Sequence, residues 1–127
     1  MDKICKVLIV EDDQEIRNLL QSVFVDEGYH AAVAGDGEAA RRIFDADDTI
    51  DLVIADIVLP QGPDGFVLAN EAARRGHRVI VITGDHRFFE RLEKSGHRYL
   101  LKPFSTNSLL QAVKDELACS KKLHPPD

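Results

Sequence analysis

The segment VLIVEDD, residues 7–13, decides the fold of this chain. Its first four residues are all apolar, which is typical of a strand that is buried on both faces. Apolar residues then recur with helical spacing, at Ile16, Leu19, Leu20, Val23 and Phe24. This spacing predicts an amphipathic helix, with Asp13 as its N-cap and Gly28 as its C-terminal stop.

The same strand-then-helix unit recurs along the chain. Further strands are predicted at residues 31–34, 52–55, 79–82 and 99–101. Helices are predicted after the turn at 35–37, from about Phe66 to Gly76, in a short segment ending near Gly96, and after the cap Ser105. Apolar strands call for helices on both faces of a parallel sheet, so the sequence predicts an α/β, doubly wound domain. We expect a single domain over 1–127, with a core at about 6–118 and a loose tail at 119–127.

Length and composition limit the class of protein. The chain has 127 residues, 44% of them hydrophobic, which suits one globular domain. It contains no apolar run of membrane-spanning length and no signal-peptide core. Cys5 and Cys119 form no CxxC pair, and we expect free thiols in a reducing cytoplasm.

Charge is unevenly distributed. The net charge is −6, which argues against non-specific nucleic-acid binding. Residues 1–64 carry 5 basic and 15 acidic side chains, whereas residues 65–127 carry 11 basic and 7 acidic ones. Two interpretations stay open: solvated helix faces, or a surface that steers a charged protein partner.

Acidic side chains follow two of the predicted strands. Glu11 and Asp12 come directly after the first strand, and Asp56 ends the third. Ligand sites in such sheets form at the carboxyl ends of the strands, so these acids are expected side by side. Two carboxylates about 4 Å apart repel by roughly 4 kcal/mol at an effective dielectric of 20, which calls for a cation or a raised pKa. Hard oxygen ligands of this kind suit Mg²⁺.

Two further groups complete the set. Lys102 follows the fifth strand, where its bond to Pro103 can be cis, and Thr83 ends the fourth strand. Alone, each could be an ordinary lysine or strand threonine. Together with the acids they provide what phosphoryl transfer onto an aspartate requires, namely a carboxylate nucleophile, a metal-holding acid pair, an ammonium and a hydroxyl.

With these residues in view, the sequence resembles the receiver domain of bacterial two-component response regulators, a CheY-like superfamily, from about Lys6 to Leu117. The motifs that carry the resemblance are VLIVEDD at 7–13, DLVIADIVLP at 51–60 with Asp64-Gly65, VITG at 81–84 and YLLKPF at 99–104. The resemblance implies a flavodoxin-like sheet of five parallel strands in the order 2-1-3-4-5, with five helices on both faces.

The resemblance also implies a role for each site residue. Asp56 would be the phosphoacceptor. Mg²⁺, or Mn²⁺, would be held by Glu11, Asp12, Asp56 and the backbone carbonyl of Val58.

On the phosphate side, Thr83 and Lys102 would bind the phosphoryl group. Tyr99 would be an aromatic switch that turns inward when Thr83 moves toward the phosphate. The alternative for Tyr99 is a plain packing residue, since a tyrosine often anchors a strand to a helix.

The sequence departs from the family pattern in several places. Glu11 replaces the more usual aspartate, and the loop from Pro60 to Gly65 is one residue longer than usual. The interval from Thr83 to Lys102 is short, which predicts a truncated or displaced fourth helix. Val58 lies at a position that tunes self-dephosphorylation in the family, and its apolar side chain predicts slow loss of the phosphate.

The expected function is that of a phosphoacceptor receiver rather than an enzyme, with only self-catalysed phosphorylation and dephosphorylation. Its expected partners are a histidine kinase or histidine phosphotransfer protein and an unknown output protein, with no direct nucleic-acid or membrane binding. The start at Met1 and the short stretch after the last helix favour a stand-alone receiver. The alternative is a fragment of a larger regulator or hybrid histidine kinase.

Three other functions fit these residues less well. A phosphohydrolase would usually carry a second aspartate where Val58 stands. A flavin-binding protein would need a hydroxyl- and glycine-rich phosphate loop where this chain has acids that repel phosphate. A pseudo-receiver that only binds partners is disfavoured by the complete set of acids, threonine and lysine.

Overall fold

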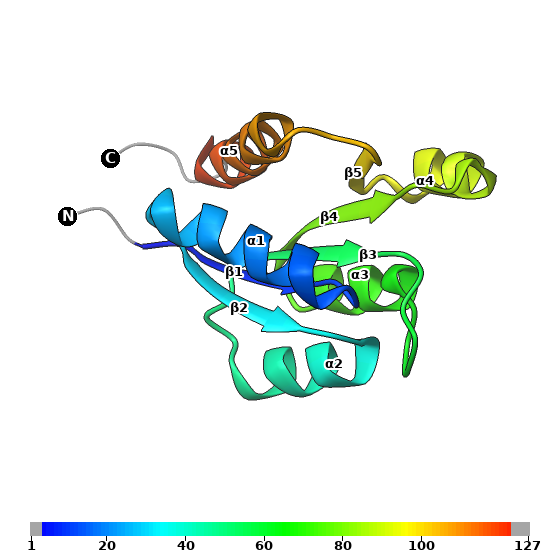
Figure 1. The fold of residues 1–127 in the computed structure, drawn as a ribbon, viewed down its shortest axis with the longest axis horizontal. Helices are drawn as coiled ribbons and strands as arrows, with labels where there is room; N and C mark the ends of the chain where they lie inside the picture. The colour runs from blue at the N-terminus through cyan, green and yellow to red at the C-terminus, as the bar shows by residue number, and fades with distance from the viewer. Residues whose placement is uncertain (1–3, 123–127) are drawn as a thin grey trace.

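The computed structural model describes the backbone of residues 4–122 and the side chains of residues 4–118. Five parallel strands form one sheet in the order β2-β1-β3-β4-β5 (Figure 1). The strands are β1 Lys6–Val10, β2 His30–Ala34, β3 Leu52–Asp56, β4 Arg78–Thr83 and β5 Arg98–Leu101. The predicted doubly wound α/β fold and its strand order are confirmed.

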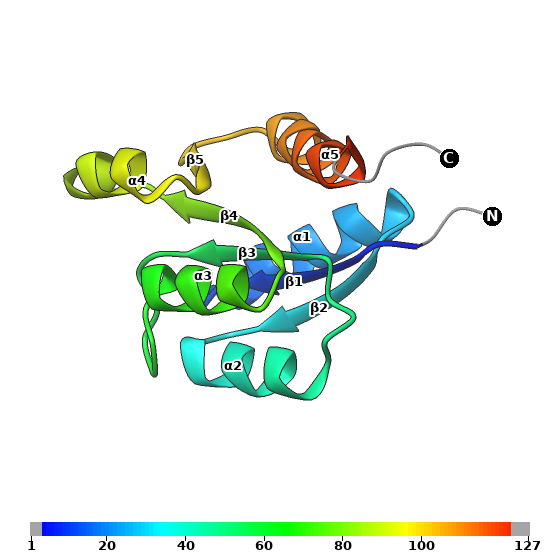
Figure 2. The same cartoon turned by 180° about the vertical axis from the view of Figure 1, so that it is seen from behind.

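Helices cover both faces of the sheet. They are α1 Gln14–Asp26, α2 Gly37–Ala46, α3 Gly65–Arg74, α4 Phe89–Ser95 and α5 Thr106–Lys122, with a 3₁₀ turn, η1, at His86–Phe88. Figure 1 shows α1 in front of the strands, and Figure 2 shows α3 in front of them from the other side. The buried side chains of α5 share a core cluster with those of α1, and the buried side chains of α2 share one with those of α3. Each helix follows the strand before it, as a chain of right-handed crossovers requires.

The strands are apolar throughout because both of their faces are buried. In β1, Leu8 and Val10 pack into one core cluster with α2 and α3, whereas Val7 and Ile9 pack into another with α1 and α5. All four side chains are at most 1% exposed. This burial explains why the strand patterns show continuous apolar runs rather than alternation.

Side-chain caps determine where the helices begin. The carboxylates of Asp13, Asp36 and Asp64 each accept a hydrogen bond from a backbone N–H three residues further on, at 2.7–3.1 Å. The hydroxyl of Ser105 accepts the corresponding bond from the N–H of Ser108 at 3.0 Å. These bonds satisfy first-turn donors that have no partner within the helix. The caps predicted at Asp13 and Ser105 are confirmed.

The fourth helix is short, as the reduced interval before Lys102 predicts. It has seven residues, follows the 3₁₀ turn, and ends at Gly96 in a left-handed conformation with φ +78°. Figures 1 and 2 both show α4 lying beyond the carboxyl end of β4. Its buried Leu92 still packs into the core cluster shared with α2 and α3.

Part of the segment predicted as a loose tail is helical. The predicted tail at 119–127 overlaps the last turn of α5 at 119–122, and residues 123–127 lie outside the described residues. Cys5 is a free thiol, and the side chain of Cys119 lies outside the described ones. Among the described residues, no helix has the length and apolar character needed to cross a membrane.

Candidate functional site

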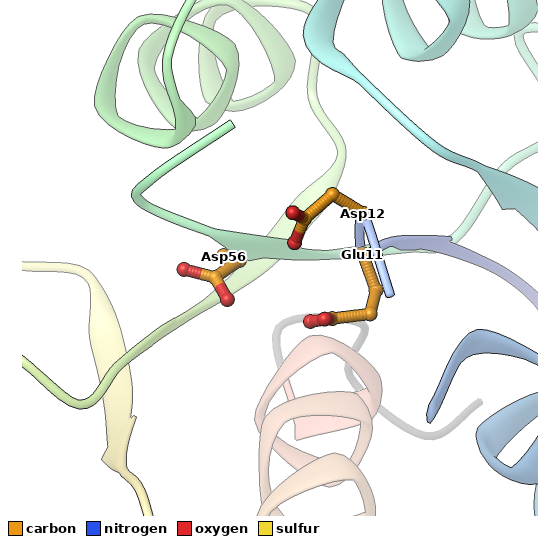
Figure 3. A group of neighbouring side chains, drawn as sticks. All are labelled: Glu11, Asp12 and Asp56. Carbon is orange, nitrogen blue, oxygen red and sulfur yellow. The ribbon is translucent and has the colours of Figure 1, made fainter. Parts of the chain in front are cut away.

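Three carboxylates meet at the carboxyl edge of the sheet. Glu11 and Asp12 directly follow β1, and Asp56 is the last residue of β3, the strand next to β1. One ligand oxygen from each residue lies within 4.8 Å of the other two (Figure 3). The structure therefore brings together the acids that the sequence predicts to be neighbours.

The three acids differ in exposure. Glu11 is 4% exposed and Asp56 is 7% exposed, whereas Asp12 faces solvent. Burial raises the pKa of Glu11, and the charge of Asp56 adds to this rise, while Lys102 and the N–H of Asp13 oppose it. A buried carboxylate of this kind gains most from a cation placed among the three acids.

Lys102 supplies the positive charge within this group. Its Nζ lies 2.6 Å from Oδ2 of Asp56 and 3.6 Å from Oε2 of Glu11. Partial burial lowers the pKa of Lys102, but its hydrogen bond to Asp56 and the charges of Asp56 and Glu11 raise it, and the net shift is upward. The ammonium form is therefore held beside the acids. The Lys102-Pro103 peptide bond is cis.

Thr83 ends β4, one residue after the partner of Asp56 in the sheet. Its side chain is buried, and its Oγ1 accepts a hydrogen bond from the N–H of Asp85 at 3.0 Å. That bond occupies the hydroxyl as an acceptor and leaves its hydrogen available for donation. At the next position, a Cβ added to Gly84 would lie 3.3 Å from Cβ of Lys102, so glycine leaves room for the lysine stem.

Val58 contacts Asp56 through its backbone, and Tyr99 packs against the core. The N–H of Val58 donates to Oδ1 of Asp56 at 3.1 Å, and its side chain is 60% exposed. Tyr99 is partly buried, pairs with Val81 in the sheet, and packs against the core cluster shared with α2 and α3. Its position fits the packing alternative, and its switching role stays a prediction.

Arg17 is a contributor that the sequence analysis missed. From the second turn of α1, its Nη1 donates to the backbone carbonyl of Glu11 at 2.9 Å and reaches that of Asp12 at 3.4 Å. It therefore holds the backbone from which both acids project. A basic residue one helical turn beyond the cap Asp13 is the only sequence signal for it, and that spacing is common on helices.

This arrangement suits one kind of chemistry. Carboxylate oxygens are hard ligands, and three of them within reach of one another could bind a divalent metal ion. Asp56 makes the shorter of the two ion pairs with Lys102, at 2.6 Å against 3.6 Å for Glu11, and lies within metal-sharing distance of both other acids. It is therefore the group placed to act as a nucleophile toward an electrophile whose negative charge Lys102 can neutralise.

Comparison with known sequences places these features in a family. Residues 7–114 match the family described as "Response regulator receiver domain". The chain is 34% identical over 114 residues to the transcriptional regulatory protein CpxR of Escherichia coli (strain K12), covering 86% of this chain and 47% of CpxR. This chain thus spans about half the length of the curated relatives it matches.

Solved structures similar to this chain include response regulator proteins. A CheY-like receiver domain protein from Methanospirillum hungatei JF-1 superposes with a TM-score of 0.86 at 25% identity, covering 96% of this chain and all of that one. The response regulator TrrA from Thermotoga maritima, solved in complex with Mg²⁺-BeF, superposes with a TM-score of 0.78 at 30% identity. That match covers 88% of this chain and 98% of TrrA.

Proposed function

The chain belongs to the response regulator receiver domain family of two-component signalling, and we propose that Asp56 is its phosphoacceptor. The phosphoryl group comes from a phosphohistidine on a histidine kinase or histidine phosphotransfer protein. The observation that carries the proposal is the contact set of Asp56, whose carboxylate lies among Glu11 and Asp12 and 2.6 Å from the ammonium of Lys102.

The donor set fits Mg²⁺, or Mn²⁺ in its place. Glu11, Asp12 and Asp56 would hold the ion, together with the backbone carbonyl of Val58. When bound, the ion neutralises charge on the phosphoryl oxygens. The similar response regulator TrrA was solved in complex with Mg²⁺-BeF, which supports a divalent metal ion in this chain as well.

In the reaction, a carboxylate oxygen of Asp56 forms a bond to phosphorus as the bond between phosphorus and the donor's imidazole nitrogen breaks. The electron pair of the broken bond stays on the imidazole nitrogen. Lys102 bonds to one phosphoryl oxygen, and Thr83 donates its hydroxyl hydrogen to another. Both groups stabilise charge on the transferred group and positioning supplies the rest, as is usual for phosphoryl transfer.

Phosphorylation then changes the surface of the domain. Moving a two-state equilibrium from mostly off to mostly on takes about 5.5 kcal/mol of differential stabilisation. New charge-assisted hydrogen bonds from Thr83 and Lys102 to the phosphate contribute to this difference. The change reaches a protein-interaction surface through β4 and β5, with Tyr99 as the moving side chain. A stand-alone receiver and the receiver part of a larger regulator would share this step.

Intact-mass spectrometry tests the proposal. The chain is incubated with acetyl phosphate and Mg²⁺, and Asp56→Asn is treated in the same way. We expect one phosphate adduct on the wild type, no adduct on the variant, and no adduct on the wild type when EDTA replaces Mg²⁺. An adduct of equal yield on Asp56→Asn would contradict the proposal.

A further inference from the structure

We propose that the β2–α2 turn, Gly35-Asp36-Gly37, positions the metal-holding acids from outside the site. The inference rests on the proposed function, because it assumes that these acids bind Mg²⁺. The turn contributes no carboxylate to the cluster at Glu11, Asp12 and Asp56. Its glycines, however, contact Arg17, which holds the loop that carries Glu11 and Asp12, and the loop that directly follows Asp56. These loops are the β1–α1 loop, residues 11–13, and the β3–α3 loop, residues 57–64.

Gly37 receives the β3–α3 loop. The N–H of Gly37 donates to the backbone carbonyl of Gln61 at 2.9 Å. A Cβ added at position 37 would overlap the backbone carbonyl oxygen of Pro63 and would lie 3.0 Å from its nitrogen. The close approach of the two backbones therefore depends on glycine.

A glycine of the β3–α3 loop makes a similar close contact with α2. Gly62 has φ +78°, and a Cβ there would lie 2.6 Å from the backbone nitrogen of Glu38, the next residue of α2. The tip of the β3–α3 loop, which is one residue longer than the usual family spacing, thus rests on the first turn of α2 through two glycines. Backbone against backbone leaves little freedom for the loop to shift.

The same loop carries groups of the site. It begins directly after Asp56, its base is closed by the N–H of Gly65 donating to the carbonyl of Ile57 at 2.9 Å, and Val58 lies between. The N–H of Val58 holds Oδ1 of Asp56 at 3.1 Å. The hydrogen bond between Gly65 and Ile57 fixes the base of the loop. If a side chain at position 37 displaces the tip, the backbone between base and tip, which includes Val58, must therefore change its conformation.

Gly35 serves the other loop. The N–H of Glu11 donates to the carbonyl of Ala34 at 3.0 Å, which joins the start of the β1–α1 loop to the end of β2. A Cβ at position 35 would lie 3.0 Å from Nη1 of Arg17, the atom that donates to the carbonyl of Glu11. Glycine at 35 therefore leaves room for the guanidinium that holds the backbone of Glu11 and Asp12.

A substitution at position 37 has different expected effects on the helix and on the contact with the β3–α3 loop. Gly37 is the first residue of α2 and has no positive φ, so alanine is compatible with its backbone conformation. On propensity alone, Gly37→Ala would favour the helix. A loss of metal affinity therefore reports the contact with the β3–α3 loop.

Isothermal titration of the metal-free full chain with Mg²⁺ gives the readout, and Gly76→Ala is the matched control. Gly76 has φ +90° with nothing within 4 Å of an added Cβ. It lies between α3 and the start of β4, at the end of the strands opposite to the acids. Gly76→Ala should lower the thermal midpoint and leave the Mg²⁺ dissociation constant unchanged. Gly37→Ala should weaken Mg²⁺ binding about tenfold, in line with residues that support metal ligands. Equal Mg²⁺ affinity in Gly37→Ala and the wild type would overturn the proposal.

Gly35→Ala decides the question if Gly37→Ala does not fold, because its closest neighbour is the movable end of Arg17. Weaker Mg²⁺ binding supports the positioning role, and unchanged binding overturns it. Phosphorylation of the wild type by acetyl phosphate is measured alongside. A wild type that binds Mg²⁺ but takes up no phosphate contradicts the proposed function and leaves the positioning role standing. A wild type that binds no Mg²⁺ overturns both.

Discussion

The ammonium of Lys102 lies 2.6 Å from Oδ2 of Asp56, so the cation that would meet the incoming phosphoryl group already contacts the proposed acceptor. The lysine reaches this point from the end of β5, two strands away from β3. Its side chain is 35% exposed, whereas that of Asp56 is 10% exposed. The ion pair is therefore buried on the acid side and open to solvent on the lysine side.

Replacement of Lys102 by alanine should destabilise the metal-free protein. Asp56 and Glu11 would lose their shared cation, and we expect the free energy of unfolding in EDTA to fall by about 1–2 kcal/mol. This is less than the ~3–5 kcal/mol typical of fully buried pairs, because solvent screens the lysine. Urea unfolding measures the change, and Mg²⁺ should restore part of it. Lys94→Ala, which removes an exposed pair with Glu90, is the control. An equal loss of stability in both variants would contradict a specific role of Lys102 in stabilising Asp56 and Glu11.

Glu11→Gln should have the opposite effect on the metal-free protein. Burial raises the pKa of Glu11, so its charged form is disfavoured in the folded chain and a neutral isostere is better tolerated. At neutral pH we expect the free energy of unfolding in EDTA to increase, and the affinity for Mg²⁺ to decrease. Urea unfolding and calorimetric titration measure the two quantities. The exposed Glu90→Gln should not increase stability, and a destabilised Glu11→Gln would count against this reading.

The phosphorylated protein should lose its phosphate slowly. Val58 is 60% exposed at the position two residues after the acceptor, and its apolar side chain cannot orient an attacking water. Val58→Asn supplies hydrogen-bonding groups there and should shorten the lifetime about tenfold or more. Intact-mass spectrometry at successive times after removal of acetyl phosphate follows the decay. A wild-type half-life of seconds in Mg²⁺ buffer would show the prediction to be wrong.

Stability should depend on His97 below neutral pH. Burial lowers the pKa of His97 below its ordinary value of 6.5, and the charge of Glu116 opposes this shift only in part. The unfolded chain therefore binds a proton more readily, so the contribution of His97 to stability is complete above pH 6.5 and is lost as the pH falls through its folded pKa. His97→Gln can keep the bond to Asn70, which is 2.9 Å from Nε2 of His97. Urea unfolding between pH 7 and roughly pH 5 should show a shallower fall in the variant. An unchanged slope would exclude His97 as the cause.

The sequence predicts the fold well because its elements are marked by local chemistry. Continuous apolar runs such as residues 7–10 indicate strands buried on both faces, and Asp13 and Ser105 mark helix starts by their capping chemistry. The rule that sites form at the carboxyl ends of parallel strands then predicts that Glu11, Asp12 and Asp56 meet. Each of these signals depends on one element or on strand adjacency alone.

The rest depends on contacts that no local pattern encodes. Nothing in the sequence indicates that Gly37 and Gly62 bring α2 against the β3–α3 loop, because the same glycines would suit ordinary turns. The bond from Arg17 to the carbonyl of Glu11 depends on a long side chain folding back toward the strand. Such contacts are set by tertiary packing, and they can be found only once the elements are placed in space.

The most direct test of the central claim is to locate the phosphate on the chain. After incubation with acetyl phosphate and Mg²⁺, borohydride reduces an aspartyl phosphate to homoserine, and peptide mass spectrometry then identifies the residue. The account predicts homoserine at position 56, and no other aspartate or glutamate reduced, Asp12 and Glu11 included. Homoserine at Asp12 or at any aspartate other than Asp56, or the corresponding five-carbon alcohol at a glutamate such as Glu11, would contradict it.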